Sequence, residues 1–237
     1  TSFYQPFDMA QRYFVEPGLF AIRTAEDLYN DGDRVATYRF VDLGGRIDFG
    51  LNVGRTAQMR LGYVMTERRA EAQTGLSQLP EIDTRDAGLA VSAFYDSRNT
   101  DAFATKGIAA AIEYLYTDDA LGGDREWERI EAGVRTAIPV GKHFMWFSLA
   151  GGADLGDELP ADRAFSLGGP MTLPAYQLDE VRARSYSLAD ASFLWRIKEL
   201  VAVKNQAIYG GLGVQAAGFY DRVDPVDDGE IYGLSGY

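Results

Sequence analysis

The sequence contains no cysteine, and this absence excludes several kinds of site at once. Without thiols there is no disulfide framework, no thiolate zinc site and no cysteine nucleophile. Basic residues are also in deficit, because 23 Lys and Arg stand against 35 Asp and Glu, which gives a formal net charge of −12. Phosphate binding needs clustered Lys and Arg, so this balance argues against a nucleic-acid partner.

Long apolar runs are missing as well. No stretch reaches the roughly 18 apolar residues of a membrane-spanning helix, and no basic-then-apolar amino-terminal stretch marks a signal peptide. The first residue is Thr1, which is typical of a processed or excised segment. Apolar residues nevertheless make up 46% of the chain, so any membrane role has to come through β-strands, whose sequence signal is weak.

Alternation with a period of two is the most informative pattern that is present. Between Tyr38 and Val53, apolar residues on one face oppose small or polar residues on the other. The same pattern recurs over 107–117, 127–138 and 208–214, and many of these segments are about ten residues long, which exceeds the usual strand of a soluble sandwich. Arg and Glu mixed with Gly on the polar face suit a wet lumen.

The alternation predicts an all-β fold, an antiparallel transmembrane β-barrel, in preference to a soluble β-sandwich or an open sheet. Connections on one side are mostly tight, as at 55–58 and 97–105. Those on the other side tend to be longer and more acidic, as at 23–34 and 156–185, which is the pattern of outer-membrane barrels. Eleven strands are expected, near residues 2–8, 11–22, 36–54, 57–70, 86–96, 106–118, 125–138, 142–155, 186–197, 205–219 and 229–237.

One segment carries a family resemblance. Phe165-Ser166-Leu167-Gly168-Gly169, followed by Leu173-Pro174-Ala175-Tyr176, resembles the inward-folded sixth loop of the outer-membrane assembly and secretion superfamily, the BamA-like surface-antigen barrels. In those barrels this loop joins strands eleven and twelve of sixteen. The resemblance implies that residues 1–237 form a single barrel segment, about 11 of 16 strands, truncated at both ends. The motif residues are Phe165, Gly168, Gly169, Leu173 and Tyr176.

Other segments are more similar to the barrel of bacterial patatin-like phospholipases that are secreted as autotransporters. They include Phe3-Tyr4-Gln5-Pro6-Phe7-Asp8, Met59-Arg60-Leu61-Gly62-Tyr63 and Gly210-Gly211-Leu212-Gly213-Val214-Gln215. This resemblance implies an outer-membrane barrel that translocates or anchors an attached patatin-like phospholipase domain by type V secretion. The implied partners are outer-membrane lipid, the upstream passenger domain and the barrel assembly machinery. The alternative is an outer-membrane assembly or two-partner secretion barrel without a lipase domain.

The loop departs from the superfamily pattern at its tip. Many members carry Arg-Gly before the aromatic residue, where this chain has Pro174 and Ala175, although the patatin-like subgroup often lacks that Arg as well. We therefore expect the tip to be held by shape and hydrogen bonds more than by an ion pair. The Tyr176 hydroxyl should donate to a polar lumenal group. The candidate partners that the alternation turns inward are Glu131, Arg135, Asp190 and Arg196.

The chemical motifs of an enzyme are incomplete. Neither Ser77 nor Ser235 lies on a strand-to-helix elbow between two glycines as a patatin-type nucleophile requires, and the only histidine, His143, follows a tight turn. The acidic clusters at 118–124 and 224–230 do not match a calcium-loop spacing. We expect no catalytic residues, metal or cofactor in this segment. An outer-membrane phospholipase barrel and a passive porin remain as alternatives, and the sixth-loop motif disfavours the porin.

Overall fold

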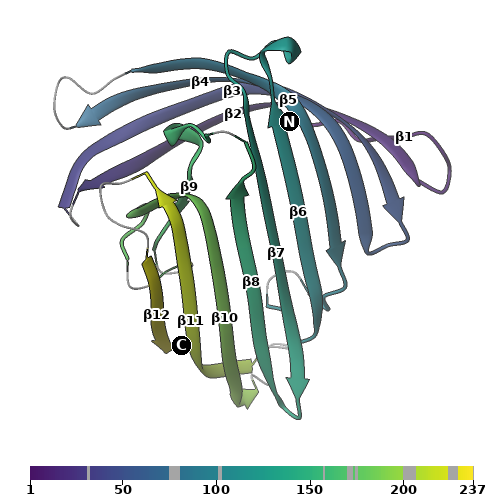
Figure 1. Cartoon of the computed structure of the whole chain (residues 1–237). Coiled ribbons are helices and arrows are strands. Elements are labelled where there is room, and N and C mark those ends of the chain that lie inside the picture. The colour runs from purple at the N-terminus through teal and green to yellow at the C-terminus, as the bar shows by residue number, and fades with distance from the viewer. Residues whose placement is uncertain are drawn as a thin grey trace.

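The computed structural model describes residues 1–30, 33–74, 81–100, 103–156, 158–169, 173, 176–199, 207–223 and 229–236. These residues form one sheet in which successive strands pair in chain order and antiparallel (Figure 1). One short strand, β9 (Phe165–Leu167), lies off this order and pairs with the start of β10.

Eleven strands make up the continuous path of the sheet. Their bounds are β1 (Gln5–Pro6), β2 (Tyr13–Asn30), β3 (Asp33–Val53), β4 (Ala57–Thr74), β5 (Ile82–Asp96), β6 (Gly107–Thr117), β7 (Trp127–Val140), β8 (His143–Asp154), β10 (Val181–Glu199), β11 (Ala207–Arg222) and β12 (Gly229–Gly236). The sequence prediction of an all-β antiparallel fold with eleven main strands is confirmed.

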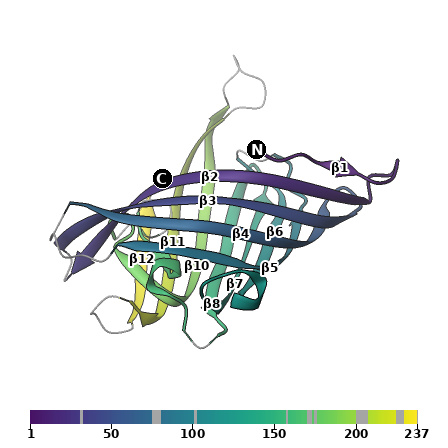
Figure 2. The same ribbon diagram turned by 90° about the horizontal axis from the view of Figure 1, so that it is seen from above.

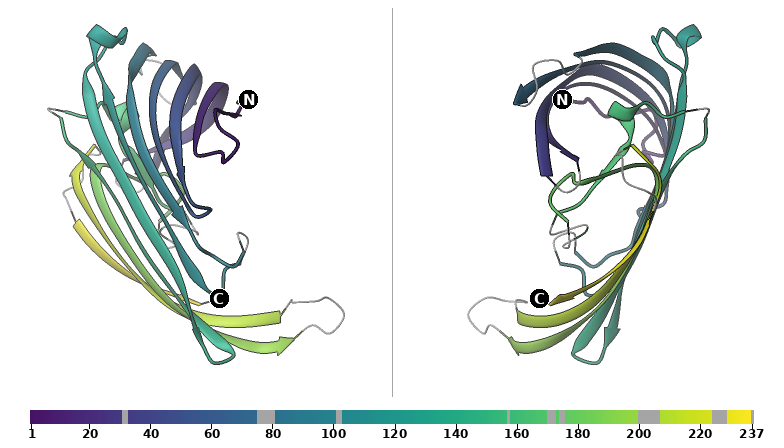
Figure 3. Two further views of the ribbon diagram at one scale, coloured as in Figure 1. Left: turned by 90° about the vertical axis from the view of Figure 1, so that its right-hand side faces the viewer. Right: turned by 60° about the vertical axis from the view of Figure 1, so that its left-hand side comes forward.

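The sheet bends into a trough, which is clearest when it is seen from above and from the side (Figures 2 and 3). Within the described part of the chain, β1 pairs only with β2 and β12 only with β11, so the sheet does not close on itself. The concave side holds β9 and the chain around it (Figure 3).

The two faces of the sheet differ as the alternation requires. Glu113, Glu131, Gly152 and Tyr186 lie opposite one another in four consecutive strands and therefore share a face. Tyr186 touches Phe165 of β9, which identifies this face as the concave one. The alternate residues point outward and leave many large apolar side chains exposed on the convex face, among them Leu43, Leu61, Val91, Ile112, Val134, Leu149 and Leu212.

Some strands extend beyond the sequence prediction, as β5 does by beginning at Ile82 rather than at residue 86, and two connections differ in kind. The segment 23–34, expected to be a long acidic loop, instead continues β2 and β3 as a paired hairpin with an irregularity between Leu28 and Tyr29. The segment 97–105, expected to be a tight turn, is a wider connection whose Phe103 contacts Phe144, Trp146 and Tyr209 on other strands.

Helix is confined to two single turns in the described residues, η1 (Asp119–Leu121) and η2 (Ala161–Arg163). No helix among those residues is long and apolar enough to cross a membrane.

Candidate functional site

The connection between β8 and β10, residues 155–180, is the best candidate for a functional site because its described residues pack on the concave face. Leu159, Phe165, Leu167 and Leu173 are buried there with side chains of the wall. The wall residues of this cluster come from three strands, β7, β10 and β11, and are Trp127, Val181, Ala183, Tyr186, Ala217 and Phe219. A loop that buries leucines and a phenylalanine in this way is attached to the wall.

Phe165 lies over a glycine of the wall. A Cβ built on Gly152 would come within 2.4 Å of the Phe165 ring, so a larger residue at that position would displace the ring. The Tyr186 ring meets Phe165 edge to face, with 5.0 Å between ring centroids. The Arg129 guanidinium lies 5.4 Å from the centre of the Phe165 ring, a distance at which a cation is attracted to an aromatic face.

Gly168 and Gly169 shape the turn that follows. Both have positive φ, at +136° and +87°, which side-chain-bearing residues rarely adopt. The Gly169 amide donates to the carbonyl of Tyr176 at 3.1 Å, and the Leu173 amide donates to the carbonyl of Gly169 at 2.9 Å. The five predicted motif residues are thus brought together in one folded turn. Pro174 and Ala175 lie outside the described residues.

The expected hydrogen bond of the Tyr176 hydroxyl is not seen among the described residues. Tyr176 is half-buried and packs against the loop cluster, but no hydrogen bond from its hydroxyl to another described residue exists. The Tyr186 hydroxyl of the wall instead donates to Glu131 Oε1 at 2.8 Å. Glu131, one of the four candidate partners of Tyr176, is therefore bound by a tyrosine of the wall. Alternation identifies which face a residue occupies but not how far along the strand the loop reaches.

The other three candidate partners lie on the same face, farther along the wall. Arg135 and Asp190 both lie opposite Ser148 of β8, and the Ser192 hydroxyl donates to Asp190 at 3.2 Å. The Arg196 guanidinium is 5.9 Å from the centre of the Tyr209 ring. No hydrogen bond or ion pair joins Arg135 or Asp190 to the described part of the loop motif.

Charged side chains attach the first half of the loop to the wall. The carboxylate of Asp86 in β5 accepts hydrogen bonds from Arg125 Nη2 at 2.9 Å, from Arg163 Nε at 2.8 Å and from Trp127 Nε1 at 3.1 Å. Arg125 also donates to Asp162 Oδ1 at 2.7 Å. Asp162 and Arg163 belong to the loop and Asp86 to the wall, so this cluster joins the two.

A second part of the same network reaches β3 and β4. Arg68 forms a two-pronged ion pair with Asp42, both contacts at 2.7 Å, and its other nitrogen donates to the backbone carbonyl of Asp162. Arg182 Nη2 donates to the carbonyl of Ala161 at 2.9 Å and lies 3.5 Å from Glu26. We call the ion pairs among Asp42, Arg68, Asp86, Arg125, Asp162 and Arg163 the loop clamp.

The loop clamp shifts the pKa values of its two arginines outside the strands, Arg125 and Arg163, in opposite directions. Burial lowers the pKa of the Arg125 guanidinium, but its hydrogen bonds and charge pairs with Asp162 and Asp86 raise it above the usual value overall. Burial also lowers the pKa of the Arg163 guanidinium, and the neighbouring Arg68 cation lowers it further. The sequence does not predict the loop clamp, because Asp162 and Arg163 lie in the long connection 156–185, which has no periodicity, and Arg125 is expected at the first position of a strand, 125–138.

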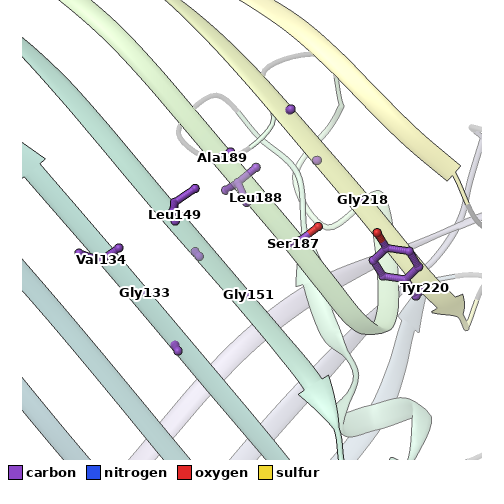
Figure 4. A pocket seen from close by; sticks show the side chains of 13 residues that line it. Gly133, Val134, Leu149, Gly151, Ser187, Leu188, Ala189, Gly218 and Tyr220 are labelled. Atoms are coloured by element: carbon purple, nitrogen blue, oxygen red, sulfur yellow. The ribbon is translucent and has the colours of Figure 1, made fainter.

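The convex face has a shallow hollow of about 550 Å³ that crosses β7, β8, β10 and β11 (Figure 4). Its lining is mainly Gly, Ala, Val and Leu, with the hydroxyls of Ser187 and Tyr220 near one end. A Cβ on Gly218 would come within 2.8 Å of the Tyr220 hydroxyl, so the tyrosine folds along the wall. This lining is apolar and suits contact with lipid tails.

The residues weighed for catalysis are not assembled into a site. His143 Nδ1 accepts a hydrogen bond from the Arg196 backbone amide at 3.0 Å, which gives this ring a structural contact. Ser77 lies outside the described residues, and Ser235 pairs with Gly213 in the sheet. In the described part of the chain, no group of three or more His, Asp or Glu side chains is placed to hold a metal.

Comparisons with known proteins give one family and one fold. The Omp85 superfamily domain matches residues 1–230. The crystal structure of BamA from Haemophilus ducreyi lacking POTRA domains 1–3 is similar, with a TM-score of 0.74 and 14% sequence identity, over 93% of this chain and 49% of that one. The chain therefore spans about half the length of that structure, and the likeness concerns the fold. No curated protein matches the chain by sequence.

Proposed function

The chain belongs to the Omp85 superfamily, and from this premise we propose that it is a barrel segment that translocates or anchors an attached patatin-like phospholipase domain. Membership makes the chain part of a bacterial outer-membrane protein, and the segment is a transporter-type barrel rather than an enzyme. We also propose that residues 1–237 are one unit, completed by further strands on both sides and inserted by the barrel assembly machinery.

The observation that carries the proposal is the loop held against the concave wall. A loop buried through Leu159, Phe165 and Leu173 and clamped by ion pairs to three strands occupies the space through which a polypeptide would pass. In a passive pore such an arrangement would only obstruct flow. In a translocator the loop can support the wall in one state and be displaced in another. The two states differ by the few contacts of the loop clamp, so a bound polypeptide can shift the equilibrium between them.

The alternative function, assembly of other outer-membrane proteins or two-partner secretion, uses the same superfamily barrel and the same loop. The resemblance of segments such as 59–63 and 210–215 to patatin-like autotransporters favours the attached passenger. The two functions differ in their cargo, which is part of the same polypeptide in one and a separate protein in the other.

The test compares two neighbouring arginines in the full-length protein expressed in a Gram-negative host. Arg68 belongs to the loop clamp, whereas Arg69 points to the convex side and forms only an exposed pair with Asp83 at 3.7 Å. Arg68→Ala removes the two-pronged partner of the half-buried Asp42 and leaves it only Arg163 at 4.0 Å among the described residues. Loss of one partner of a buried pair typically costs about 3–5 kcal/mol, whereas an exposed pair is worth about 0–1 kcal/mol. We expect Arg68→Ala to reduce passenger display at the cell surface severalfold and Arg69→Ala to leave it unchanged.

Heat-modifiable gel mobility reports whether each variant barrel has inserted, and protease accessibility of the lipase domain on intact cells reports display. The conservative variant Arg68→Lys should retain part of the display, because it keeps a cation beside Asp42 but loses the two-pronged geometry. Normal display of the passenger by an inserted Arg68→Ala barrel would contradict the proposal. A lowered level of other outer-membrane proteins, with no passenger affected, would favour the assembly function.

A further inference from the structure

The connection between β5 and β6 places a phenylalanine among aromatic residues of distant strands. Phe103 lies with its ring centroid 5.5 Å from that of Phe144, 4.9 Å from that of Trp146 and 5.3 Å from that of Tyr209. Phe144 and Trp146 belong to β8 and Tyr209 to β11, so the connection passes across the positions of β6 and β7 to reach them. We call Phe144, Trp146 and Tyr209 the aromatic niche.

The aromatic niche is on the concave face, at the end of the sheet opposite the loop clamp. Trp146 lies opposite Ala137 and Ser192, and two residues farther along β8 comes Ser148, opposite Arg135 and Asp190 on the same face. The short connections 54–56 and 141–142 share this end, which is the periplasmic one by the general rule for outer-membrane barrels. A chain entering from the periplasm would meet the niche first.

The niche binds a main-chain group as well as a side chain. The Trp146 indole N–H donates to the backbone carbonyl of Ala104 at 2.7 Å, next to the ring of Phe103. The niche thus recognises the ring of one residue together with the backbone carbonyl of the next residue. Any extended peptide that contains Phe or Tyr presents these two groups. The ring supplies apolar contact area, and the indole N–H satisfies one backbone acceptor.

The connection does not need this contact to keep its own shape. The Asn99 side chain accepts hydrogen bonds from the amides of Thr105 and Lys106 at 3.1 and 3.2 Å, and Arg98 pairs with Asp96 at 2.6 Å. Phe103 itself stays 38% exposed, whereas Phe144 beneath it is 1% exposed. Phe103 therefore lies partly exposed on a more deeply buried aromatic surface.

We propose that the aromatic niche is a binding site for an aromatic residue of an extended polypeptide, and that Phe103 occupies it as an internal competitor. An incoming chain displaces Phe103 by presenting its own ring to Phe144 and Tyr209 and its own carbonyl to Trp146. The inference rests on the proposed handling of polypeptide by the barrel. It adds the chemistry by which the periplasmic end recognises that polypeptide.

The test measures peptide binding and does not depend on translocation. The probe is a fluorescently labelled peptide with the sequence of residues 99–106, Asn-Thr-Asp-Ala-Phe-Ala-Thr-Lys, added to the full-length protein in detergent and followed by fluorescence anisotropy. The wild type should bind it weakly, because Phe103 fills the site. Phe103→Ala should bind it at least tenfold more tightly, and the same peptide with Ala in place of Phe should not bind.

Two further variants separate the parts of the site. Adding Trp146→Phe to Phe103→Ala keeps a ring and removes the indole donor, so affinity should fall about fivefold, as for the loss of one neutral hydrogen bond. Adding Tyr209→Ala should weaken binding further. The matched control is Phe193→Ala, because Phe193 is exposed to a similar extent, 37%, but lies on the convex face. It should bind the probe as weakly as the wild type.

Folded Phe103→Ala protein that does not bind the probe, or that binds the Ala peptide equally well, would overturn the inference. Heat-modifiable mobility on gels shows whether the Phe103→Ala variant is folded. If it is not folded, Phe103→Leu is used instead, because it keeps an apolar contact but has no ring. A protein that binds the probe but translocates nothing would refute the proposed function and leave the niche intact. A protein that translocates its passenger without binding the probe would refute the niche and leave the proposed function intact.

Discussion

Glycine residues on the concave face decide where aromatic side chains lie. A Cβ on Gly50 would come within 1.9 Å of the Phe14 ring, and one on Gly152 within 2.4 Å of the Phe165 ring. In each pair the ring covers backbone that has no side chain of its own, as designed sheets also require beside glycine. In the Gly152 pair the covered glycine belongs to the wall and the ring to the loop, so a single position links the two.

Gly152→Ala should therefore loosen the loop. The added methyl group has to move the Phe165 ring, and overpacking of this kind costs about 1–3 kcal/mol. We expect lower stability of the full-length protein in urea titrations and faster protease cleavage near Phe165. The control is Gly133→Ala on the same face, where the nearest atoms to a new Cβ are 3.7 and 3.8 Å away. Equal stability of the two variants would show that Phe165 is not held by Gly152.

Single residues also show where sequence reasoning stops. The motif residues Phe165, Gly168 and Gly169 could be named because their order resembles a known loop. The contact of Arg163 with Asp86 joins residues 77 positions apart, across a space that no local pattern describes. Alternation predicts that Asp86 points inward, but its partner depends on the path of a loop without periodicity.

At the scale of the strands, alternation was sufficient to predict most of the fold. The eleven main strands follow from a period of two, because one face of each strand must be apolar and the other polar. Their antiparallel order follows from the short connections between many of them, since parallel neighbours need a long crossover. The ends of strands were harder to predict. The acidic residues between Arg23 and Arg34 predict a loop, yet the strands of this hairpin pair to the end, because backbone pairing of a hairpin continues without an apolar face.

A pair of neighbouring substitutions tests the assignment of the faces. Ile112 lies on the convex face and is 42% exposed, whereas Glu113 lies on the concave face, 3.5 Å from Arg46. Ile112→Arg should cost about 2–4 kcal/mol, because it places a charge against lipid near mid-membrane. Glu113→Arg meets Arg46 but remains in a polar lumen, so its cost should be much smaller. Urea titration of the full-length protein in lipid vesicles measures both, and equal costs would show the assignment to be wrong.

At the scale of the whole molecule, the open sheet has a cost in lipid. The outward-facing edges of β1 and β12 have no strand paired to them within the described residues, and each unpaired backbone group in a bilayer costs several kcal/mol. We expect the 237-residue chain expressed alone to aggregate or to stay an open sheet, with no heat-modifiable band on gels. A stable, water-soluble monomer with native strand content would contradict the membrane assignment.

The position of the loop from 155 to 180 gives the last prediction, because an inward loop and an outward loop differ in what a protease can reach. Leu159, Phe165 and Leu173 are buried against the wall, and long loops that are not packed in this way are usually mobile on the surface. Intact cells that display the full-length protein should therefore resist cleavage between Gly168 and Tyr176 by a protease of broad specificity. The same segment should be cut once the protein is unfolded, which controls for sequence preference, and Gly152→Ala should be cut at an intermediate rate. Rapid cleavage of the wild type on intact cells would place the turn outside, and the clamped loop would then have no part in translocation.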